Sequence, residues 1–394
     1  MRILFICGSL APGKDGVGDY TRLLASELAA SGQEPVVFGW MDAHTDRYQD
    51  AREEVRGQSL RCIRLPREAR WKQRFSCLGT LLNQFQPDCV SLQYVPWTYG
   101  RFGASGKPAR LLRQLLPSRA CRQIMFHELW IGGNPQDPPR ERLIGALQKR
   151  SILKLVRAVR PQVCHSSNPA YLRRLEAEGI PARLLPLFGN IPVAPPDAEG
   201  SLGRIAARSQ GAFRPEDRKA WLLSAVFGTV HPQWTPHPAI ESCLARLEAE
   251  AGGRRLALLF LGRGGRQAEP LRDSLVSRFG DSLLCLDLGE MDPAGLSALF
   301  QELDFGFAAS PIGLAGKSGS AVAMMEHGLP VLFTRFDVAA PPAETPACYL
   351  AARARRFEAS DFDWSAFLAE RTAPGPVLPA VAERFLSDLE RRPQ

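Results

Sequence analysis

The stretch SPIGLAGKSGSAVAMMEHGLPV, from Ser310 to Val331, decides the fold class of this chain. It follows an apolar run, Phe305–Ala309, that is typical of a buried strand, and it continues through a glycine-rich loop and an apolar helical segment to a second strand. A strand, a loop, a helix and a return strand in this order are the repeating unit of a parallel α/β sheet. The Gly-Lys-Ser triplet in the loop raises the question of whether the loop binds a phosphate.

The same alternation runs through the whole chain and predicts an α/β protein with two Rossmann-like, doubly wound parallel sheets. The strands expected in the first half are Ile3–Cys7, Pro35–Gly39, Cys89–Gln93, Gln123–His127 and Val163–Ser166. Those expected in the second half are Trp221–Phe227, Leu256–Gly262, Leu283–Leu286, Phe305–Ala309 and Val331–Thr334. The main helices expected between them are Tyr20–Ala30, Leu143–Val159, Pro238–Ala251, Ala268–Phe279 and Ala294–Glu302.

A segment rich in proline, glycine and charge, residues 188–219, interrupts this pattern and is interpreted as a linker with an appended loop. The predicted domains are therefore residues 1–190 and residues 191–375, facing each other across a cleft. Residues 376–394 should form a last helix with one apolar face that packs against another element. Ligands of open parallel sheets bind beyond the carboxyl ends of the strands, so we expect the site in the cleft.

Composition indicates a protein of the cytoplasm. The nine cysteines are scattered and form no C-x-x-C pair, which argues against a disulfide framework and a zinc site and favours a reducing compartment. No run approaches the roughly 18 apolar residues of a membrane helix. The first residues, with Gly8 and Pro12 interrupting the apolar run, are typical of a strand and turn rather than a signal peptide.

Positive charge is concentrated in the first half of the chain. Residues 1–190 carry 28 Lys and Arg against 16 Asp and Glu, a net charge of +12, and the remainder carries −4. An anionic substrate and peripheral contact with the inner face of an acidic membrane both fit this excess, as does an ordinary solvated surface. Nucleic acid is not expected as a partner, because aromatic residues are not interleaved with the basic ones and no nucleic-acid motif is present.

The Gly-Lys-Ser triplet does not fit a nucleoside triphosphatase P-loop, which we keep only as a remote alternative. That motif requires a glycine five residues before the final Gly-Lys pair, where this chain has Pro311. We predict instead that Gly316, Lys317 and Ser318 bind a diphosphate at the start of the following helix. Glu326, two turns further along, could accept hydrogen bonds from the hydroxyls of a ribose.

Three further loops follow predicted strands and are candidate parts of the site. Gly16 and Gly18 could expose backbone amides to an anion at the start of the first helix. His127, in FHELW, follows the fourth strand, and Arg263, in FLGRGG, could supply a cation. No metal site is predicted, since His231 and His237 lie six residues apart, a spacing that fits neither a helix face nor a strand face.

These segments together resemble the retaining glycosyltransferases of the GT-B fold, and in particular the large family 4 group. The resemblance rests on VGDYTRLLASELAASG, FHE, FGNIPV, AVFGTV, LLFLGRGG, LGEMDPAGLSALFQELDFGFAASP and AMMEHGLPVLF, and it covers nearly the full length. It implies a nucleotide-sugar donor on the second domain, a glycan, lipid-linked or small-molecule acceptor on the first, no metal cofactor, and a last helix that crosses back to the first domain. It also implies hexosyl transfer in polysaccharide biosynthesis.

The resemblance gives several residues a role. Glu326 resembles the second glutamate of a paired element and would contact the ribose, Gly16 and Gly18 match the loop near the donor phosphates, and His127 resembles the histidine beside the transferred sugar. The first glutamate of that pair is Ser318 here. The usual arginine and lysine fall on Thr229 and Trp234.

We therefore predict that Lys317, supported by Arg263, replaces the missing positive charge, so that His127 and Lys317 are the catalytic candidates. Because of these departures, the alternative is a non-catalytic relative that binds a sugar nucleotide or acts as a scaffold.

Overall fold

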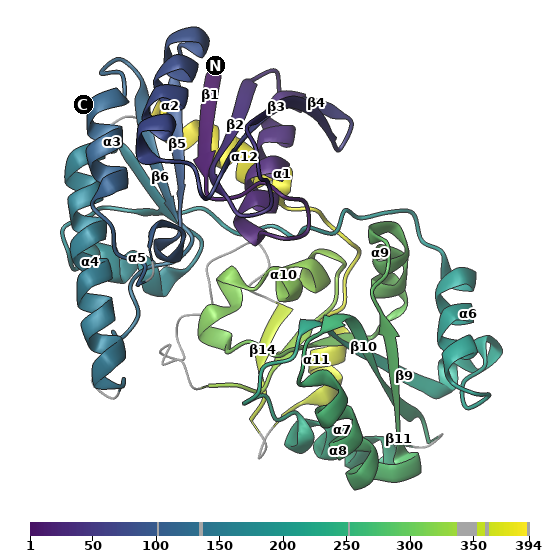
Figure 1. Cartoon of the computed structure of the whole chain (residues 1–394). Helices are drawn as coiled ribbons and strands as arrows, with labels where there is room; N and C mark the ends of the chain where they lie inside the picture. Colours follow the sequence, from purple (N-terminus) through teal and green to yellow (C-terminus); the bar gives the residue numbers. More distant parts are fainter. Residues whose placement is uncertain (101, 134–136, 251–252, 337–352, 359–361, 392–394) are drawn as a thin grey trace. The chain divides into compact units, whose positions relative to one another are not determined.

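The computed structural model describes residues 1–100, 102–133, 137–250, 253–336, 353–358 and 362–391 (Figure 1). The chain divides into two compact units, one made of Met1–Pro186 with Leu378–Gln394 and the other of Leu187–Val377. Each unit is a mainly parallel α/β sheet covered by helices, so the predicted fold class is confirmed. All ten expected strands are present, with small differences in their ends.

The first unit contains an eight-stranded sheet in the order β3-β4-β2-β1-β5-β6-β7-β8. The strands are β1 (Arg2–Cys7), β2 (Glu34–Asp42), β3 (Gln49–Val55), β4 (Gln58–Pro66), β5 (Cys89–Tyr94), β6 (Cys121–Phe126), β7 (Val163–Ser166) and β8 (Arg183–Leu184). All neighbours are parallel except β3 and β4, which form a hairpin. The direction in which strands are added reverses between β1 and β5, which makes this point the topological switch of the sheet.

The β3–β4 hairpin was not predicted. Its turn is made by Arg56 and Gly57, which both have positive φ, and Val55 pairs directly with Gln58 across it. In the basic stretch of residues 61–75, Arg61 forms an ion pair with Asp50 of β3. Apolar and polar residues alternate along β4, as is typical of a half-buried strand. The charged residues on its solvated face made this pattern hard to see in the sequence.

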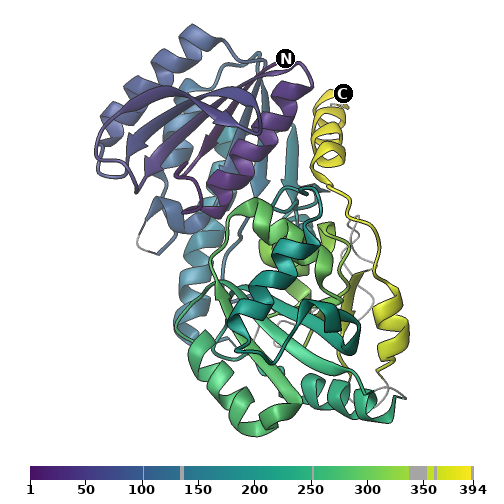
Figure 2. The same cartoon turned by 90° about the vertical axis from the view of Figure 1, so that its right-hand side faces the viewer.

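Helices cover both faces of this sheet. They are α1 (Gly16–Ala30), α2 (Trp71–Phe85), the short 3₁₀ helix η1 (Pro96–Tyr99), α3 (Lys107–Leu115), α4 (Pro139–Val159), α5 (Pro169–Glu176) and α12 (Leu378–Glu390). Leucines and isoleucines of α2, α3 and α4 share one core with Leu4 and Ile6. On the opposite face α1 and α12 lie side by side, as Figure 2 shows.

The last helix, α12, packs on the sheet of the first unit through its apolar face. Phe385 is fully buried and stacks on Phe5 of β1, with the ring centroids 5.8 Å apart. Asp388, on the same helix, accepts a hydrogen bond from His165 Nε2 of β7 (3.0 Å) and one from Arg183 (2.8 Å). The expected apolar face of this helix is thus buried, together with one carboxylate whose two oxygens are both hydrogen-bonded.

The second unit contains six parallel strands in the order β11-β10-β9-β12-β13-β14. They are β9 (Trp221–Thr229), β10 (Arg255–Gly264), β11 (Leu283–Gly289), β12 (Phe305–Ala308), β13 (Val331–Phe333) and β14 (Ala354–Arg356). The helices are α6 (Ala198–Arg208), η2 (Pro215–Ala220), α7 (His237–Ala249), α8 (Ala268–Phe279), η3 (Gly280–Ser282), α9 (Pro293–Glu302), η4 (Ile312–Lys317), α10 (Gly319–Glu326) and α11 (Trp364–Ala369). Its switch point lies between β9 and β12.

The interpretation of residues 188–219 as a loop was wrong in part, because they contain α6. Asp197 caps this helix by accepting a hydrogen bond from the backbone N–H of Gly200, and Leu202 and Ile205 are buried on one face. The prolines and glycines that flank the helix dominated the sequence pattern, although an N-cap aspartate before an apolar face is a recognisable start signal.

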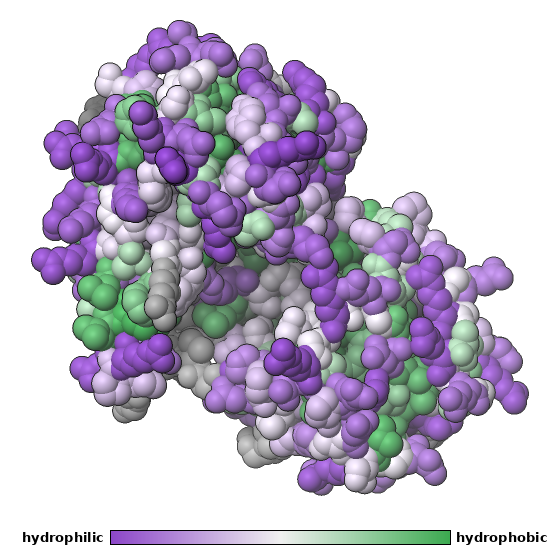
Figure 3. Space-filling model, viewed as in Figure 1, coloured by the Kyte–Doolittle hydropathy of each residue, from purple (hydrophilic) through white to green (hydrophobic). Residues whose placement is uncertain are grey.

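Charged and polar residues cover most of the face seen in Figure 3. Within the described part of the chain, no helix combines the length and the apolar character that crossing a membrane requires. The eight cysteines in the described ranges are free, and Cys348 lies outside those ranges.

The contact between His165 and Asp388 should make the stability of the first unit depend on pH. Burial lowers the pKa of His165 below its usual 6.5, and the hydrogen bond to Asp388 opposes this only partly. Below about pH 6.5 this histidine is protonated in the unfolded protein but not yet in the folded one. The free energy of unfolding should therefore fall as the pH decreases from about 6.5. Urea unfolding between pH 8 and pH 5 measures this slope.

The variant His165→Asn should have a flatter profile in that range, whereas His44→Asn, at an exposed position, should keep the wild-type slope. Equal slopes in all three proteins would refute this account. At lower pH a second decline is expected, because the hydrogen bonds and charges of His165 and Arg183 outweigh burial and lower the pKa of Asp388.

Candidate functional site

Each unit has a candidate site of its own at the carboxyl ends of the strands beside its switch point, where the loops lie close together. In the first unit Gly8 follows β1 and Thr98 follows β5, and a Cβ added to Gly8 would lie 2.9 Å from Thr98 Cγ2. In the second unit Gly228 lies at the end of β9, and an added Cβ would be 3.4 Å from Ser320 Cβ at the start of α10. Open α/β sheets bind their ligands at such places.

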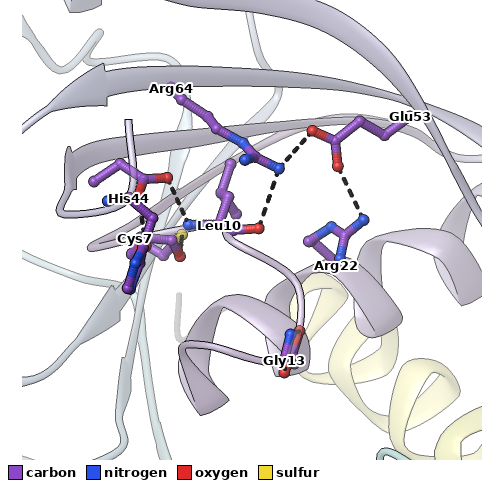
Figure 4. Close-up of polar contacts among 10 residues, drawn as sticks. Cys7, Leu10, Gly13, Arg22, His44, Glu53 and Arg64 are labelled. Carbon is purple, nitrogen blue, oxygen red and sulfur yellow. Dashed lines mark hydrogen bonds and ion pairs between the residues drawn. The ribbon is translucent and has the colours of Figure 1, made fainter. Parts of the chain in front are cut away.

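A buried carboxylate fixes the loop that follows β1 (Figure 4). Asp42, at the end of β2, is fully buried and accepts hydrogen bonds from Ser9 Oγ (2.8 Å) and from the backbone N–H of Leu10 (3.0 Å) and His44 (2.9 Å). Three hydrogen bonds to one buried carboxylate hold the backbone that donates to it in place. The loop is therefore held in one conformation from the β2 side.

The β3–β4 hairpin holds the same loop from a second side. Arg64 donates to the carbonyl of Leu10 (3.3 Å) and to Glu53 (2.6 Å), and Glu53 also accepts from Arg22 of α1 (2.9 Å). These contacts, drawn in Figure 4, tie the loop, the hairpin and α1 together. None of these residues was singled out from the sequence.

The start of α1 carries two carboxylates, which differs from what an anion-binding loop requires. Asp15 caps the helix by accepting from the Gly18 N–H (2.8 Å), and the carboxylate of Asp19 accepts from the Gly13 N–H (3.0 Å). Burial raises the pKa of Asp19 more than its contacts with Gly13 and Arg22 lower it. The Gly18 amide is thus already hydrogen-bonded, and the predicted contact of Gly16 and Gly18 with phosphates remains a prediction.

Gly18 has a packing reason to be glycine, and Gly16 has none. A Cβ added at Gly18 would lie 2.4 Å from the carbonyl oxygen of Ser9, whereas a Cβ at Gly16 would meet nothing within 4 Å. The absence of a side chain at Gly18 allows α1 to approach the backbone that follows β1. This is the role of a glycine in close helix–strand packing.

His127, directly after β6, is almost buried, with 9% of its surface exposed. Its Nε2 donates to Gln93 Oε1 (2.8 Å), and its ring lies edge-on to that of Tyr20, with centroids 4.8 Å apart. Gln93 lies on β5, beside the switch point of the sheet. Because the Gln93 oxygen is an acceptor, the Nε2 atom of His127 carries a proton.

Gln93 is the first link of a continuous chain of buried hydrogen bonds. Its Nε2 donates to Ser91 Oγ (2.7 Å), and Ser91 Oγ donates to Gln123 Oε1 (2.6 Å). Gln123 Nε2 then donates to His165 Nδ1 (3.0 Å), and His165 Nε2 donates to Asp388 of α12. Every donor has an acceptor in this order, so the chain orients His127 and His165 together. Sequence analysis missed these residues, although polar side chains on strands as apolar as β5 and β6 were a signal.

The loop that contains Gly316, Lys317 and Ser318 lies at the switch point of the second unit. Lys317 ends the 3₁₀ helix η4, and Ser318 caps α10, its Oγ accepting from the Ala321 N–H at 3.4 Å. Gly316 is buried. Pro311 directly precedes η4 and follows β12, the fourth strand of the unit along the chain. The loop therefore does not take the place that a P-loop has after a first strand.

Glu326, at the end of α10, is only 3% exposed, and its carboxylate already has a backbone partner. Oε1 accepts from the Val377 N–H (3.1 Å), and a Cβ added to Gly189 would lie 2.6 Å from Oε2. The carbonyl of Glu326 also accepts from the Gly375 N–H (2.8 Å). This carboxylate therefore joins α10 to the segment that leads to α12, and its contact with a ribose stays a prediction.

The two cations near this site differ in their surroundings. Arg263 is exposed and forms an ion pair with Glu290, so much of its charge is balanced within the unit. Arg335, which follows β13, was not predicted. It is buried and donates to the carbonyl of Ala309 (3.1 Å) after β12 and to Gln233 Oε1 (3.4 Å). It fixes the loops that follow β9, β12 and β13 relative to one another.

In the described ranges no group of three or more histidine, cysteine, aspartate or glutamate side chains could hold a metal ion. The segment SDFDW contains two aspartates spaced as in a D-x-D metal motif; Asp361 lies outside the described ranges, and Asp363 caps α11 by accepting from the N–H groups of Ser365 and Ala366. The use of a metal is therefore not indicated by any of these side chains, and metal independence remains a prediction.

No protein-family model matches the sequence, and no curated protein matches it. Several solved structures share its fold. A UDP-forming α,α-trehalose-phosphate synthase from Burkholderia xenovorans is 14% identical with a TM-score of 0.56, and 99% of each chain is covered. The catalytic domain of starch synthase IV from Arabidopsis thaliana, bound to ADP and acarbose, is 12% identical with a TM-score of 0.53, again over 99% of each chain.

A lipopolysaccharide outer core galactosyltransferase, WaaB, is 11% identical with a TM-score of 0.50 over 99% of this chain and 97% of that one. A putative UDP-N-acetylglucosamine 2-epimerase from Listeria monocytogenes is also 11% identical, with a TM-score of 0.51 over 99% and 95%. These likenesses show that the chain has the GT-B fold. They do not by themselves identify its chemistry, because transferases and an epimerase share this fold.

Replacing Gly16 and Gly18 of α1 by alanine shows which of the two glycines is required for packing. Gly18→Ala should lower the free energy of unfolding by about 1–3 kcal/mol, because the new Cβ overlaps a backbone oxygen. Gly16→Ala should leave stability unchanged or raise it by up to ~1 kcal/mol, since it removes only backbone freedom. Urea denaturation of both variants measures this difference. Equal losses in the two variants would contradict the packing role of Gly18.

Proposed function

We propose that this protein is a glycosyltransferase that moves a sugar from a nucleotide-diphosphate sugar to a glycan, lipid-linked or small-molecule acceptor. The observation that carries the proposal is the Lys317–Ser318 loop at the β9–β12 switch point of a GT-B chain. Proteins of this fold include enzymes described as UDP-forming and one bound to ADP. Transfer of a hexose, retention of configuration and independence of metals are parts of the proposal that rest on the resemblance to family 4.

The chemistry assigned to the second unit is stabilisation of the leaving group. Cleavage at the anomeric carbon leaves negative charge on the nucleoside diphosphate. The ammonium group of Lys317 and the N–H groups at the start of α10 can stabilise this charge without a metal. Ser318 and Gly316 would shape the loop, and Glu326 would hold the ribose after releasing or sharing its contact with the Val377 N–H.

The first unit would contribute His127 beside the transferred sugar. Its Nε2 is engaged by Gln93, so the tautomer and the plane of the ring are set before substrate binds. Pre-orientation of this kind lowers the cost of reaching a reactive geometry. In this proposal Gln93 is a positioning residue, and it acts on the sugar only through His127.

A non-catalytic sugar-nucleotide-binding protein is the second candidate, and two observations favour it. Trp234 stands where the family has a cation. It is buried against Phe307, so this position supplies no positive charge for a diphosphate. Arg263 is paired with Glu290. This candidate predicts saturable donor binding without transfer or hydrolysis.

Donor binding and turnover test the proposal directly. UDP-, GDP-, ADP- and dTDP-sugars are screened by thermal shift, since a ligand at about 100 times its Kd adds ~2.7 kcal/mol to folded-state stability. With a donor that binds and forms product, Lys317→Ala should lower kcat/KM by a factor that corresponds to about 2–4 kcal/mol. Lys219→Ala, on η2, is the matched control and should change nothing. Wild-type kcat/KM in Lys317→Ala would refute the role of this lysine.

The proposed location is the cytoplasm, with peripheral contact to an acidic membrane. A cavity of about 510 Å³ supports this contact, because it is lined by Arg113, Arg122, Lys154, Arg157 and Arg160 and by no carboxylate. It lies where β6 begins and α4 ends, and Arg122 donates there to the Val159 carbonyl (3.0 Å). Clustered arginines and lysines bind anionic lipid surfaces.

Vesicle sedimentation tests this contact. Binding to vesicles with acidic lipid should decrease with salt and should weaken several-fold in Arg157→Gln/Arg160→Gln. The control Arg140→Gln/Arg142→Gln removes the same charge from the other end of α4 and should bind as the wild type does. Binding that depends on neither acidic lipid nor salt would rule out the proposed contact.

A further inference from the structure

A second cavity of the first unit, with a volume of about 470 Å³, has a composition that suits a ligand. Its walls include two tryptophans, a tyrosine, a serine and two cations, and we call it the tryptophan pocket. These residues are Trp71, Trp97, Tyr99, Ser105, Arg67 and Lys107. They come from the loop before α2, from α2 itself, from η1 and from the start of α3, so no single stretch of sequence reveals the pocket.

The tryptophan pocket lies at the edge of the sheet where the candidate site of this unit is located. Trp97 and Tyr99 belong to η1, which follows β5 after a single residue, and Met41 near the end of β2 also lines the pocket. Thr98, another lining residue, is the side chain closest to Gly8 after β1. The pocket is thus beside the β1–β5 switch point, and His127 follows β6, the strand next to β5.

The aromatic residues can bind the face of a sugar ring. Trp97 is 41% exposed and Trp71 is partly exposed. A pyranose has faces of C–H groups that pack against an indole, while its hydroxyls remain available for hydrogen bonds. Ligand pockets commonly combine such aromatic walls with a few polar groups that fix orientation. Ser105 and Thr98 supply hydroxyls here.

Two of the aromatic walls, Trp71 and Tyr99, are fixed by contacts with Trp40 before any ligand binds. Trp71 packs edge-on against Trp40 (centroids 6.1 Å apart), and Trp40 packs in the same way against Tyr99 (5.6 Å). Trp40 Nε1 also donates to the Tyr99 hydroxyl (3.3 Å). A preformed wall reduces the entropy lost on binding.

Buried Arg74 fixes the loop that carries Arg67. Only 1% of its surface is exposed, and its Nη2 donates to the carbonyls of Pro66 (3.0 Å), Arg67 (2.6 Å) and Ala69 (2.9 Å). Its guanidinium also lies 5.6 Å from the centre of the Trp71 ring. Burial lowers the pKa of Arg74 to about 10, so it stays a cation at neutral pH and adds to the positive field of the pocket.

The charged side chains that line the tryptophan pocket, Arg67 and Lys107, are both positive. Arg67 and Lys107 are exposed, Lys107 Nζ lies 5.9 Å from the centre of the Trp71 ring, and no carboxylate lines the cavity. A larger cavity of the same unit, of about 790 Å³, contains Asp46, Asp50 and Glu68 as well as arginines. A single sign of charge beside exposed indoles therefore distinguishes the tryptophan pocket.

We propose that the tryptophan pocket binds the acceptor of the sugar transfer, and that this acceptor is a sugar bearing a phosphate or a carboxylate. The inference rests on the proposed function and specifies its acceptor class. Trp97 stacks on the sugar ring, while Arg67 and Lys107 bind the acidic group. The acceptor hydroxyl then faces the carboxyl edge of the sheet, where His127 lies.

The test measures binding without donor. Tryptophan fluorescence titrations use three probes: a hexose 6-phosphate, a hexuronate and the unmodified hexose. One or both acidic sugars should bind roughly tenfold more tightly than the neutral hexose, and the tighter of the two identifies phosphate or carboxylate as the recognised group. Trp97→Ala and Arg67→Gln should each weaken that binding roughly tenfold. Lys72→Gln, an exposed neighbour of Trp71 outside the pocket, should bind as the wild type does.

Equal affinity for all three probes, or unchanged binding in both pocket variants, would overturn the proposal. Thermal unfolding shows whether the variants are folded, and Arg67→Lys should recover part of the affinity if charge is what matters. In the transferase assay the same variants should raise the KM for acceptor and leave the KM for donor unchanged. If acidic sugars bind but no donor yields a product, the assignment as an acceptor site fails together with the proposed function. If product forms equally well from neutral acceptors, only the acceptor class is wrong.

Discussion

The hydrogen bond between His165 and Asp388 is the contact on which the arrangement of the first unit depends. It joins β7 to α12, which is more than 200 residues further along the chain, and the ring of His165 lies 6.2 Å from that of Phe385, which stacks on Phe5. A polar group buried at this depth is tolerated only if its partners are present, so the energetic cost of a misplaced α12 is high. The same chain of hydrogen bonds continues through Gln123 and Ser91 to Gln93 and His127. Docking of the last helix and orientation of the candidate catalytic histidine are thereby parts of one polar network.

The return of the chain toward α12 is controlled at a second point by Glu326. Its carboxylate and its carbonyl hold the N–H groups of Val377 and Gly375 immediately before α12 begins. A residue chosen from the sequence for its chemistry is thus also a structural residue. A ribose bound there would share this carboxylate with the Val377 N–H, so ligand binding and the path of this segment would be coupled.

Most of the fold was predictable, because its strands and helices follow simple periodicities. The first-unit strands β1, β2, β5, β6 and β7 and all the strands of the second unit except β14 were expected, and the last helix has a plain apolar face. The β3–β4 hairpin and α6 were missed because arginines on a solvated strand face and prolines around a helix outweighed the underlying pattern. The site was less predictable. Gly18 has a packing reason that depends on the position of Ser9, and the charge of Arg263 is balanced by Glu290, 27 residues away. Neither relation is a property of a short sequence window.

Two groups of basic side chains line cavities in different parts of the first unit. The cavity lined by Arg113, Arg122 and Arg160 lies where β6 begins and α4 ends, whereas the tryptophan pocket lies where β2 and β5 end. Parallel strands all begin on one side of a sheet and all end on the opposite side. The two cavities therefore lie at opposite ends of the strands of the same sheet. Charge at the carboxyl edge can act on a substrate, since that edge is where open sheets bind ligands. Charge at the other edge has no such role and suits a surface contact. An anionic acceptor and an anionic membrane would therefore not compete for the same arginines.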